Sequence, residues 1–374
     1  MVKVMSVFGT RPEAIKMAPV VGRLAASDAV ESVVCVTGQH REMLDQVLAL
    51  FGVTPDIDLD LMTPGQRPTD VLTAVLAALG PVLEDHRPDI VLVQGDTTTA
   101  MGAALAAAYA GATVGHVEAG LRTFDKTQPF PEELNRLVVG ACGDLHFAPT
   151  ARSAGNLVAE GHDPQTVWIT GNTVIDALLE MHSRNIGLPD DDPLAAVPWD
   201  QQVILLTAHR RENFGRPIRD ALTAVATIVD RSDGRVHVVY PVHPNPEVAA
   251  AVADTVAGHP GFTITEPLDY QRLVHTMGKA TLVITDSGGI QEEAPSLGKP
   301  VLVLRDVTER PEAVDFGTVK LVGCHPEQIV TQATRLLEDP DAYAEMACRT
   351  NPYGDGRAAN RIIAAILDEP VEQF

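Results

Sequence analysis

The sequence predicts an α/β protein of two domains, each built on a doubly wound parallel sheet. Short β-branched runs alternate with helix-length amphipathic segments along the whole chain, which is typical of parallel sheets covered by helices on both faces. The 374 residues exceed one ordinary core, and a hydrophobic content of 45% is enough for two. The alternation lapses in an acidic and proline-rich stretch, residues 185–201, as is typical of a linker.

Eight β-branched runs are predicted to be strands, four in each half of the chain. One stretch that overlaps the fourth of these runs, residues 97–117, is uncharged and long enough to suggest a membrane span. Gly111 divides it, so we expect a helix followed by a strand instead. The predicted strands span residues 2–8, 32–37, 89–95, 112–118, 203–209, 236–242, 280–286 and 300–306.

We expect two Rossmann-like domains that face each other across a cleft. The first spans residues 1–172, the second spans residues 201–355, and residues 173–200 link them. The last segment, residues 356–374, has a helical pattern and is expected to pack back across the domains. Open α/β sheets bind ligands beyond the carboxyl ends of their strands, so functional residues are expected there.

The charge balance and the cysteines exclude several classes of function. Lys and Arg number 28 against 50 Asp and Glu, and a net charge of -22 repels nucleic acid and anionic membranes. We therefore expect no partner of either kind. The four cysteines lack CxxC spacing, which argues against zinc or a disulfide scaffold and favours a reduced, cytoplasmic chain. The N-terminal apolar run is too short for a signal peptide.

Basic side chains follow the first predicted strand, in the stretch FGTRPEAIK. Pro12 suits the first turn of a helix, and Arg11 is placed to donate to a phosphate at the end of the sheet. Lys16 lies one turn beyond Pro12 and can reach the same region. Alternatively, Lys16 forms only a surface ion pair with Glu13, worth about 0.3 kcal/mol.

Three carboxylates, Asp96, Glu118 and Glu132, are candidates for proton transfer. Asp96 and Glu118 end neighbouring predicted strands, and Glu132 opens a helix behind a proline-flanked loop. Carboxylates crowded together raise one another's pKa, which suits at least one of them to hold a proton near neutral pH. Taken singly, Asp96 has the alternative role of a helix N-cap, and Glu132 that of a partner for the helix dipole.

Two stretches in the second half suggest a nucleotide-binding site. In TDSGGIQEE, the turn over residues 287–289 lets a phosphate approach the amides at a helix N-terminus, unless it is only a tight strand-to-helix turn. Glu292 or Glu293 can then accept hydrogen bonds from a ribose. In TAHRRENFG, His209 can stabilise a developing phosphate charge or shuttle a proton. His243, between prolines, is expected to be a buried, satisfied histidine.

Neither a cofactor nor a metal is expected. No GxGxxG motif follows a predicted strand and no GxxxxGK[ST] motif occurs, which argues against a bound dinucleotide and against a triphosphate-binding loop. His209 has no HExxH or comparable carboxylate spacing beside it, so it is a poor candidate for a metal ligand.

Nine motifs occur in order over nearly the whole chain: FGTRPEAIKMAPV, TGQHREMLDQV, QGDTTT, HVEAGLRT, PFPEELNR, TAHRRENFG, VHPNP, TDSGGIQEEAPSLGKPVLVLRDVTERPE and NPYGDG. Together they resemble those of the bacterial non-hydrolysing UDP-N-acetylglucosamine 2-epimerases. The resemblance implies a glycosyltransferase-B type fold closing on a UDP-sugar, usually in a homodimer. It also implies conversion of UDP-GlcNAc to UDP-ManNAc, a precursor for surface polysaccharides.

The resemblance further implies roles for individual residues. A second UDP-GlcNAc would act as an allosteric activator near Gln39, His40 and Glu132. The catalytic roles fall on Asp96, Glu118, Glu132 and His209 with Lys16 in support, and the UDP contacts on Arg11, His209, Ser287, Gly288, Gly289 and Glu293.

The expected mechanism is an elimination, because the hydrogen on carbon 2 of the sugar is not acidic. Loss of UDP from carbon 1 with removal of that proton gives a 2-acetamidoglucal, and re-addition with protonation on the other face gives the epimer. Two alternatives stay open from the sequence. One is a UDP-sugar-dependent glycosyltransferase of the same fold, which needs an acceptor, and the other is a sensor that binds the UDP-sugar unchanged.

Overall fold

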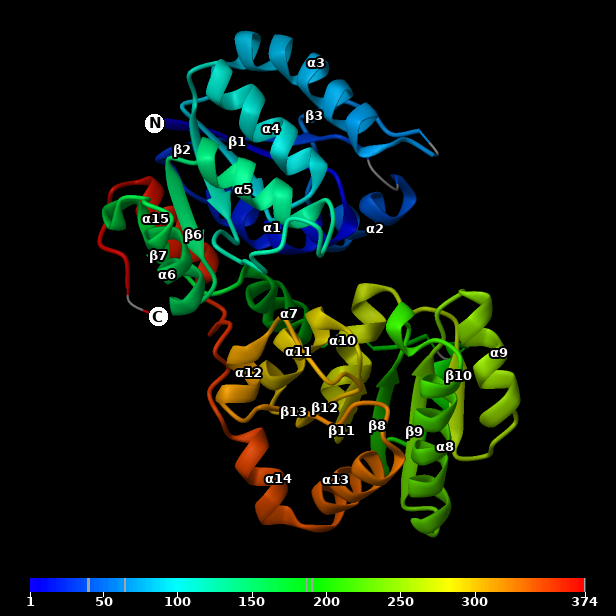
Figure 1. The fold of residues 1–374 in the computed structure, drawn as a ribbon. Helices are drawn as coiled ribbons and strands as arrows, with labels where there is room; N and C mark the ends of the chain where they lie inside the picture. Colours follow the sequence, from blue (N-terminus) through cyan, green and yellow to red (C-terminus); the bar gives the residue numbers. More distant parts are fainter. Residues whose placement is uncertain (39–40, 64, 186, 190, 373) are drawn as a thin grey trace. The chain divides into compact units, whose positions relative to one another are not determined.

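The chain folds into two compact units (Figure 1). One unit contains Met1–Ala177 together with Tyr353–Phe374, and the other contains Leu178–Pro352. The end of the chain therefore belongs to the same unit as its beginning. The structure, a computed structural model, describes residues 1–38, 41–63, 65–185, 187–189, 191–372 and 374.

The first unit is built on a seven-stranded parallel sheet with the order β3-β2-β1-β4-β5-β6-β7. The sheet grows from β1 toward one edge and then from β4 toward the other, which is the order of a Rossmann-like, doubly wound fold. The strands are β1 Val2–Phe8, β2 Val30–Val36, β3 Ile57–Asp58, β4 Ile90–Gln94, β5 Thr113–Val117, β6 Leu145–Ala148 and β7 Val167–Ile169.

Helices of this unit begin where the sequence supplies caps. Thr10 and Glu13 form a capping box at the start of α1, with Pro12 in its first turn as predicted. Helix α4 begins after the cap residue Thr97 and ends before Gly111, so the predicted division of the uncharged stretch is confirmed. The helices are α1 Arg11–Ala25, α2 Arg41–Phe51, α3 Pro68–His86, α4 Thr98–Tyr109, α5 Glu132–Cys142, α6 Ala151–Ala159, η1 Pro164–Thr166 and α15 Ala358–Ile366.

The second unit repeats the arrangement with a six-stranded parallel sheet of order β10-β9-β8-β11-β12-β13. Both sheets therefore have the doubly wound order, and the predicted fold class is confirmed. The strands are β8 Gln202–Thr207, β9 Val236–Pro241, β10 Phe262–Thr265, β11 Leu282–Thr285, β12 Val301–Val303 and β13 Val319–Leu321.

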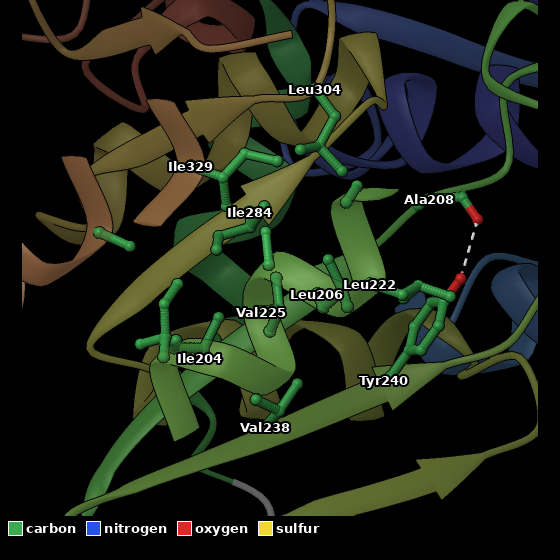
Figure 2. Close-up of a cluster of buried hydrophobic side chains, with 14 of the residues drawn as sticks. Ile204, Leu206, Ala208, Leu222, Val225, Val238, Tyr240, Ile284, Leu304 and Ile329 are labelled. Atoms are coloured by element: carbon green, nitrogen blue, oxygen red, sulfur yellow. Dashed lines mark hydrogen bonds between the residues drawn. The ribbon is translucent and has the colours of Figure 1, made fainter. Parts of the chain in front are cut away.

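The core of the second unit joins β8, β9 and β11 to helix α8 (Figure 2). Leu206 and Val225 are fully buried in it, as is Tyr240, whose hydroxyl donates to the Ala208 carbonyl at 3.2 Å. This bond satisfies the one polar atom of the Tyr240 side chain at the point where β8 ends. The core thereby fixes the turn that follows Ala208.

Residues 191–201, the later part of the acidic stretch, also pack on the second sheet. Leu194 and Val197 are buried against Val203 of β8 and Val239 of β9.

Among the described helices, none is long and apolar enough to span a membrane. Helix α7, Thr173–Ser183, runs from the first unit into the second, whose helices are η2 Pro193–Ala196, η3 Arg211–Asn213, α8 Arg216–Arg231, α9 Pro246–Thr255, α10 Tyr270–Lys279, α11 Gly288–Glu293, η4 Ala294–Leu297, α12 Pro311–Asp315, α13 Pro326–Glu338 and α14 Pro340–Ala347.

Candidate active site

Glu118 follows β5, and its buried carboxylate accepts several hydrogen bonds. The ammonium of Lys16 donates to its two oxygens at 2.8 and 2.5 Å, and the side-chain amide of Gln94 donates to Oε2. The backbone of Glu118 is left-handed, with φ +66°, a conformation that is uncommon for a non-glycine residue and that is often found at functional sites. The structure thus brings the candidates Glu118 and Lys16 together.

The alternative role of Lys16, a surface pair with Glu13, is wrong. Glu13 is buried, and its carboxylate accepts hydrogen bonds from the backbone N–H groups of Gly9 and Thr10 at 3.0 and 2.7 Å. Its other oxygen accepts the hydroxyl of Thr97 at 2.5 Å. Burial raises the pKa of Glu13, and these hydrogen bonds oppose the rise. Glu13 therefore fixes the turn after β1, which leaves the neighbouring side chain of Arg11 exposed.

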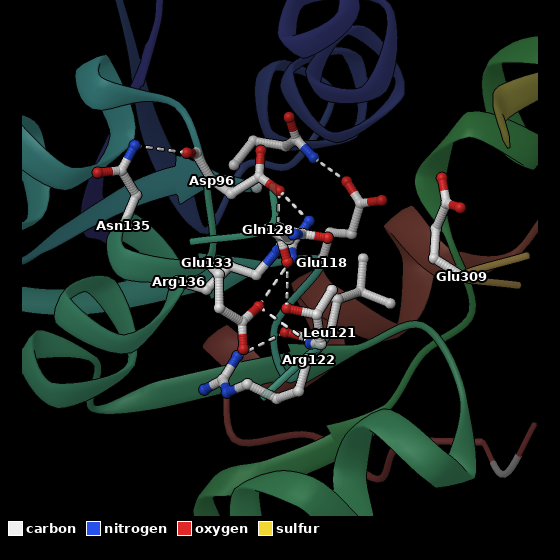
Figure 3. Close-up of polar contacts among 12 residues, drawn as sticks. Asp96, Glu118, Leu121, Arg122, Gln128, Glu133, Asn135, Arg136 and Glu309 are labelled. Carbon is white, nitrogen blue, oxygen red and sulfur yellow. Dashed lines mark hydrogen bonds and ion pairs between the residues drawn. The ribbon is translucent and has the colours of Figure 1, made fainter. Parts of the chain in front are cut away.

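Asp96 follows β4 and is held by residues of helix α5 (Figure 3). The guanidinium of Arg136 contacts one carboxylate oxygen of Asp96, and the side-chain amide of Asn135 donates to the Asp96 carbonyl at 2.8 Å. The residue that caps α4 is Thr97, whose hydroxyl accepts the N–H of Ala100 at 2.9 Å, so Asp96 is not the N-cap. The Asp96 carboxylate is instead part of an ion pair.

Glu132 and Glu133 begin helix α5 and play different parts. Glu132 is half-buried, and its Oε2 atom has no hydrogen-bond partner within the described part of the chain. Glu133 accepts the backbone N–H groups of Thr123 and Phe124 at 3.1 and 2.9 Å, and it also accepts Arg136 at 2.9 Å. Sequence reasoning chose Glu132 and overlooked Glu133 and Arg136. The three-residue spacing of the latter two, in EELNR, was the available signal.

In the second unit, the turn after β8 is organised by Asp286, which follows β11. One carboxylate oxygen of Asp286 accepts the backbone N–H groups of His209 and Arg210, both at 2.8 Å, and the side-chain amide of Asn213 at 3.1 Å. The His209 ring lies beside the other oxygen, with Nδ1 at 3.4 Å. Asp286 is completely buried. Asp286 therefore orders the backbone at the candidate His209 and places a second carboxylate oxygen beside its ring.

His243 was expected to be buried, and that expectation is wrong. Its side chain is exposed and stacks on the ring of His209, with the ring centroids 5.4 Å apart and an interplanar angle of 11°. Burial lowers the pKa of His209, the Asp286 carboxylate opposes this, and His243 and Arg210 lower it further. His209 is consequently kept neutral to lower pH than a free histidine.

The stretch after β11 forms the predicted strand-to-helix turn. Helix α11 begins at Gly288, and the side chain of Ser287 makes no capping bond to it. Glu292 is paired with Arg310, whose Nε donates to it at 2.7 Å. Glu293 accepts the hydroxyl of Tyr270 at 3.2 Å. The two glutamates that the sequence left as alternatives thus have different partners.

The remaining predictions concern an activator site and metals. Gln39 and His40 lie outside the described residues. Cys35, Cys142 and Cys324 are free thiols, as is Cys348. Among the described residues, no group of three or more His, Cys, Asp or Glu side chains has the arrangement of a metal site.

Comparison with known protein families shows to which family the chain belongs. A family model described as UDP-N-acetylglucosamine 2-epimerase matches residues 22–367. The chain belongs to the UDP-N-acetylglucosamine 2-epimerase family. The resemblance inferred from the nine motifs is therefore confirmed.

Individual members of this epimerase family are similar over their whole length. A UDP-N-acetylglucosamine 2-epimerase of Yersinia pestis is 52% identical over 374 residues, which cover 99% of each chain. The structure of the UDP-GlcNAc 2-epimerase from Neisseria meningitidis bound to UDP-GlcNAc is 47% identical and superposes with a TM-score of 0.88, covering 98% of this chain and 100% of that one. The glycotransferase of kitacinnamycin, 11% identical with a TM-score of 0.62 over 97% of this chain and 98% of its own, shares the fold alone, which is of the glycosyltransferase-B type.

In this epimerase-family chain each unit offers a different chemistry. The first unit holds the carboxylates of Glu118 and Asp96 against the cations of Lys16 and Arg136, an arrangement suited to moving protons. The second unit offers the imidazole of His209 in an ordered turn, which is suited to stabilising negative charge.

Proposed function

We propose that this protein interconverts UDP-GlcNAc and UDP-ManNAc by eliminating UDP to form 2-acetamidoglucal and then adding UDP back. The observation that carries the proposal is the contact of the buried Glu118 carboxylate with the Lys16 ammonium. The names of the relatives agree with it, as does the UDP-GlcNAc bound to the Neisseria meningitidis protein. A carboxylate beside a lysine can take up a proton and pass it on, which is what inversion at carbon 2 requires.

The reaction needs proton-handling groups on both faces of the sugar ring. We assign this work to Asp96, Glu118 and Glu132, with Lys16 in support. The Lys16 ammonium favours the ionised form of Glu118, which suits Glu118 to accept a proton. Glu132 has a carboxylate oxygen with no partner in the described chain, which leaves that atom able to bond a ligand.

We assign the UDP group to donors that follow the strands. Arg11 and His209 would stabilise the departing diphosphate, and one well-aimed donor of this kind is worth roughly 3 kcal/mol. The glycine turn gives a phosphate access to backbone N–H groups, and Glu293 would accept the ribose hydroxyls. His209 would also take part in catalysis. The residues proposed to contact UDP are Arg11, His209, Ser287, Gly288, Gly289 and Glu293.

The same proposal extends to the assembly, location, regulation and domain bounds of the protein. It includes a reaction without net hydrolysis, a homodimer, a cytoplasmic location, and activation by a second UDP-GlcNAc near Gln39, His40 and Glu132. The two domains are proposed to span residues 1–172 and 201–355, joined by residues 173–200.

The test is to incubate the protein with UDP-GlcNAc alone in deuterated water and to follow the sugar by NMR. We expect UDP-ManNAc to form, with deuterium at carbon 2 of both recovered UDP-sugars. Release of free sugar in place of the epimer would indicate hydrolysis. Consumption only after an acceptor is added would indicate a glycosyltransferase, and an unchanged UDP-sugar would indicate a sensor. Any of these three results would overturn the proposal.

A further inference from the structure

Asn172 lies beside both points at which the chain passes between the two units. The first passage follows Ala177, and the second ends at Tyr353, where the chain re-enters the first unit. The backbone N–H of Asn172 donates to the Tyr353 carbonyl at 2.6 Å. The start of α7 and the returning segment are therefore joined directly, inside the first unit.

Two glycines allow this close approach. Gly171 has a φ of +85°, and a Cβ atom placed on it would lie 3.2 Å from the Cα atom of Gly354. A Cβ on Gly354 would lie 3.1 Å from the side chain of Ile175 and 3.4 Å from the Asn172 carbonyl. The two segments consequently pack backbone against backbone, where only glycine fits without displacement of its neighbours.

Side-chain hydrogen bonds stabilise the contact between these two segments, which we call the junction. The Asp176 carboxylate accepts the N–H groups of Ala358 and Ala359 at 3.1 and 2.9 Å, at the start of α15. Arg361 donates to the Thr170 carbonyl at 3.1 Å. The junction is thus a well-ordered platform from which the Asn172 side chain projects.

The side chain of Asn172 joins this platform to Glu118. Its Oδ1 atom accepts the N–H of Val174 at 3.0 Å, and its Nδ2 atom donates to Oε1 of Glu118 at 3.1 Å. A backbone N–H requires the oxygen and a carboxylate requires the NH₂ group, so the two partners fix which way the amide points. Asn172 is only 2% exposed, so water does not compete strongly for either bond.

We propose that Asn172 is a positioning residue, which orients the Glu118 carboxylate for proton transfer and ties it to the place where the chain leaves and re-enters the first unit. The inference rests on the proposed catalytic function of Glu118. Lys16 stabilises the negative charge of that carboxylate. Asn172 fixes its orientation instead, because the neutral amide of Asn172 is hydrogen-bonded through both its nitrogen and its oxygen. A displacement of about 1 Å at a reacting group can cost about 10²-fold in rate, so the orientation of the Glu118 carboxylate matters for the reaction.

The discriminating variant is Asn172→Asp. It keeps an oxygen for the N–H of Val174 and replaces the NH₂ group with an oxygen that faces Glu118. The charged and titratable side chains facing Glu118 include Lys16 from α1 and His116 from β5. Burial lowers the pKa of His116 to about 4, so this ring stays neutral over the assay range.

For Asn172→Asp we expect kcat to fall about 10²-fold with little change in KM. We also expect the acidic limb of the pH–kcat profile to move to higher pH, because two facing carboxylates share a proton. A merely structural role would leave the profile in place. The control is Asn156→Asp, since the Asn156 amide donates to the Gly120 carbonyl at 2.9 Å and should leave the profile unchanged.

A second variant covers the case in which Asn172→Asp fails to fold. Asn172→Ser keeps an oxygen close to Val174 but is too short to reach Glu118, and we expect the same fall in kcat. An unchanged kcat in either folded variant, or the failure of both to fold, would overturn the proposal. If the wild-type protein does not epimerise UDP-GlcNAc, the proposed function fails instead. Carbon-13 NMR of the Glu118 carboxyl, assigned with Glu118→Gln, then tests whether Asn172→Asp changes its titration.

Discussion

Arg136 binds a single carboxylate oxygen of Asp96 through two nitrogens, Nε at 2.9 Å and Nη2 at 2.6 Å. Its third nitrogen, Nη1, donates to Glu133 at 2.9 Å. The Arg136 side chain is mostly buried, and that of Glu133 is almost completely so. One guanidinium therefore pairs with two carboxylates, one proposed to act in catalysis and one that holds the loop before α5.

The first prediction concerns this guanidinium. Arg136→Gln should lower the free energy of unfolding by about 3 kcal/mol, because it leaves the buried Glu133 carboxylate without its cation. Denaturant unfolding measures the change. The coupling to Asp96 follows from a double-mutant cycle with Asp96→Asn, in which the second substitution should cost less once Arg136 is absent. The control Arg216→Gln removes an exposed pair with Asp220 and should change stability by less than about 0.5 kcal/mol.

The second prediction separates catalysis from binding at Glu118. Glu118→Gln should reduce kcat by at least about 10²-fold, because an amide cannot take up the proton. The dissociation constant for UDP, measured by calorimetry, should stay nearly the same. Glu31→Gln is a matched control, since Glu31 is exposed and pairs only with Lys3 at the start of β1 in the contacts described. Equal losses of kcat and UDP affinity would instead assign Glu118 to binding or folding.

The third prediction concerns the stacked rings of His209 and His243. His243→Gln removes one cause that lowers the pKa of His209, so the His209 ring should titrate at higher pH than in the wild type. NMR of the ring Cε1–H signal measures the midpoint. His325→Gln, which affects a ring paired with Asp306, should leave that midpoint unchanged. A midpoint that stays in place in His243→Gln contradicts the prediction.

Eight of the described strands were predictable from the sequence, and five short ones were not. The run over residues 2–8 coincides with β1, and seven further runs overlap the strands β2, β4, β5, β8, β9, β11 and β12. The strands β3, β6, β7, β10 and β13 have two to four residues, and no run was recognised at them. The strands β11 and β12 are as short, but they lie within the predicted runs over residues 280–286 and 300–306.

The positions of the candidate site residues along the chain were easier to predict than the residues that they contact in the folded protein. Glu118 and Asp96 were recognised because they follow apolar runs, and strand ends carry ligands in this class of fold. The partner of Asp96 is Arg136, forty residues further on, and no local pattern joins them. The environment of His243 was missed for the same reason, since its exposure depends on a loop that the sequence does not place. Two local signals were overlooked, the T-x-x-E capping box of Glu13 and the three-residue spacing of Glu133 and Arg136.

Asp176 gives the final prediction, on pH and stability. Burial raises the pKa of its carboxyl to about 6, against hydrogen bonds from Ala359 and Ala358 that lower it. The folded state holds this proton more tightly than the unfolded state. Stability from this group is therefore complete below the unfolded pKa of 3.8 and is lost as pH rises through about 6, by roughly 3 kcal/mol.

Asp176→Asn removes this titration and keeps an oxygen at the start of α15. Urea unfolding at about pH 4 and about pH 7 should show that the stability of the wild type relative to the variant falls by roughly 2 kcal/mol between the two, since part of the loss occurs below pH 4. Asp163→Asn, at an exposed N-cap that accepts the N–H of Gln165, is the control and should show no such change. A difference between wild type and Asp176→Asn that is the same at both pH values would mean that Asp176 is ionised in the folded protein throughout this range, so that the hydrogen bonds outweigh burial.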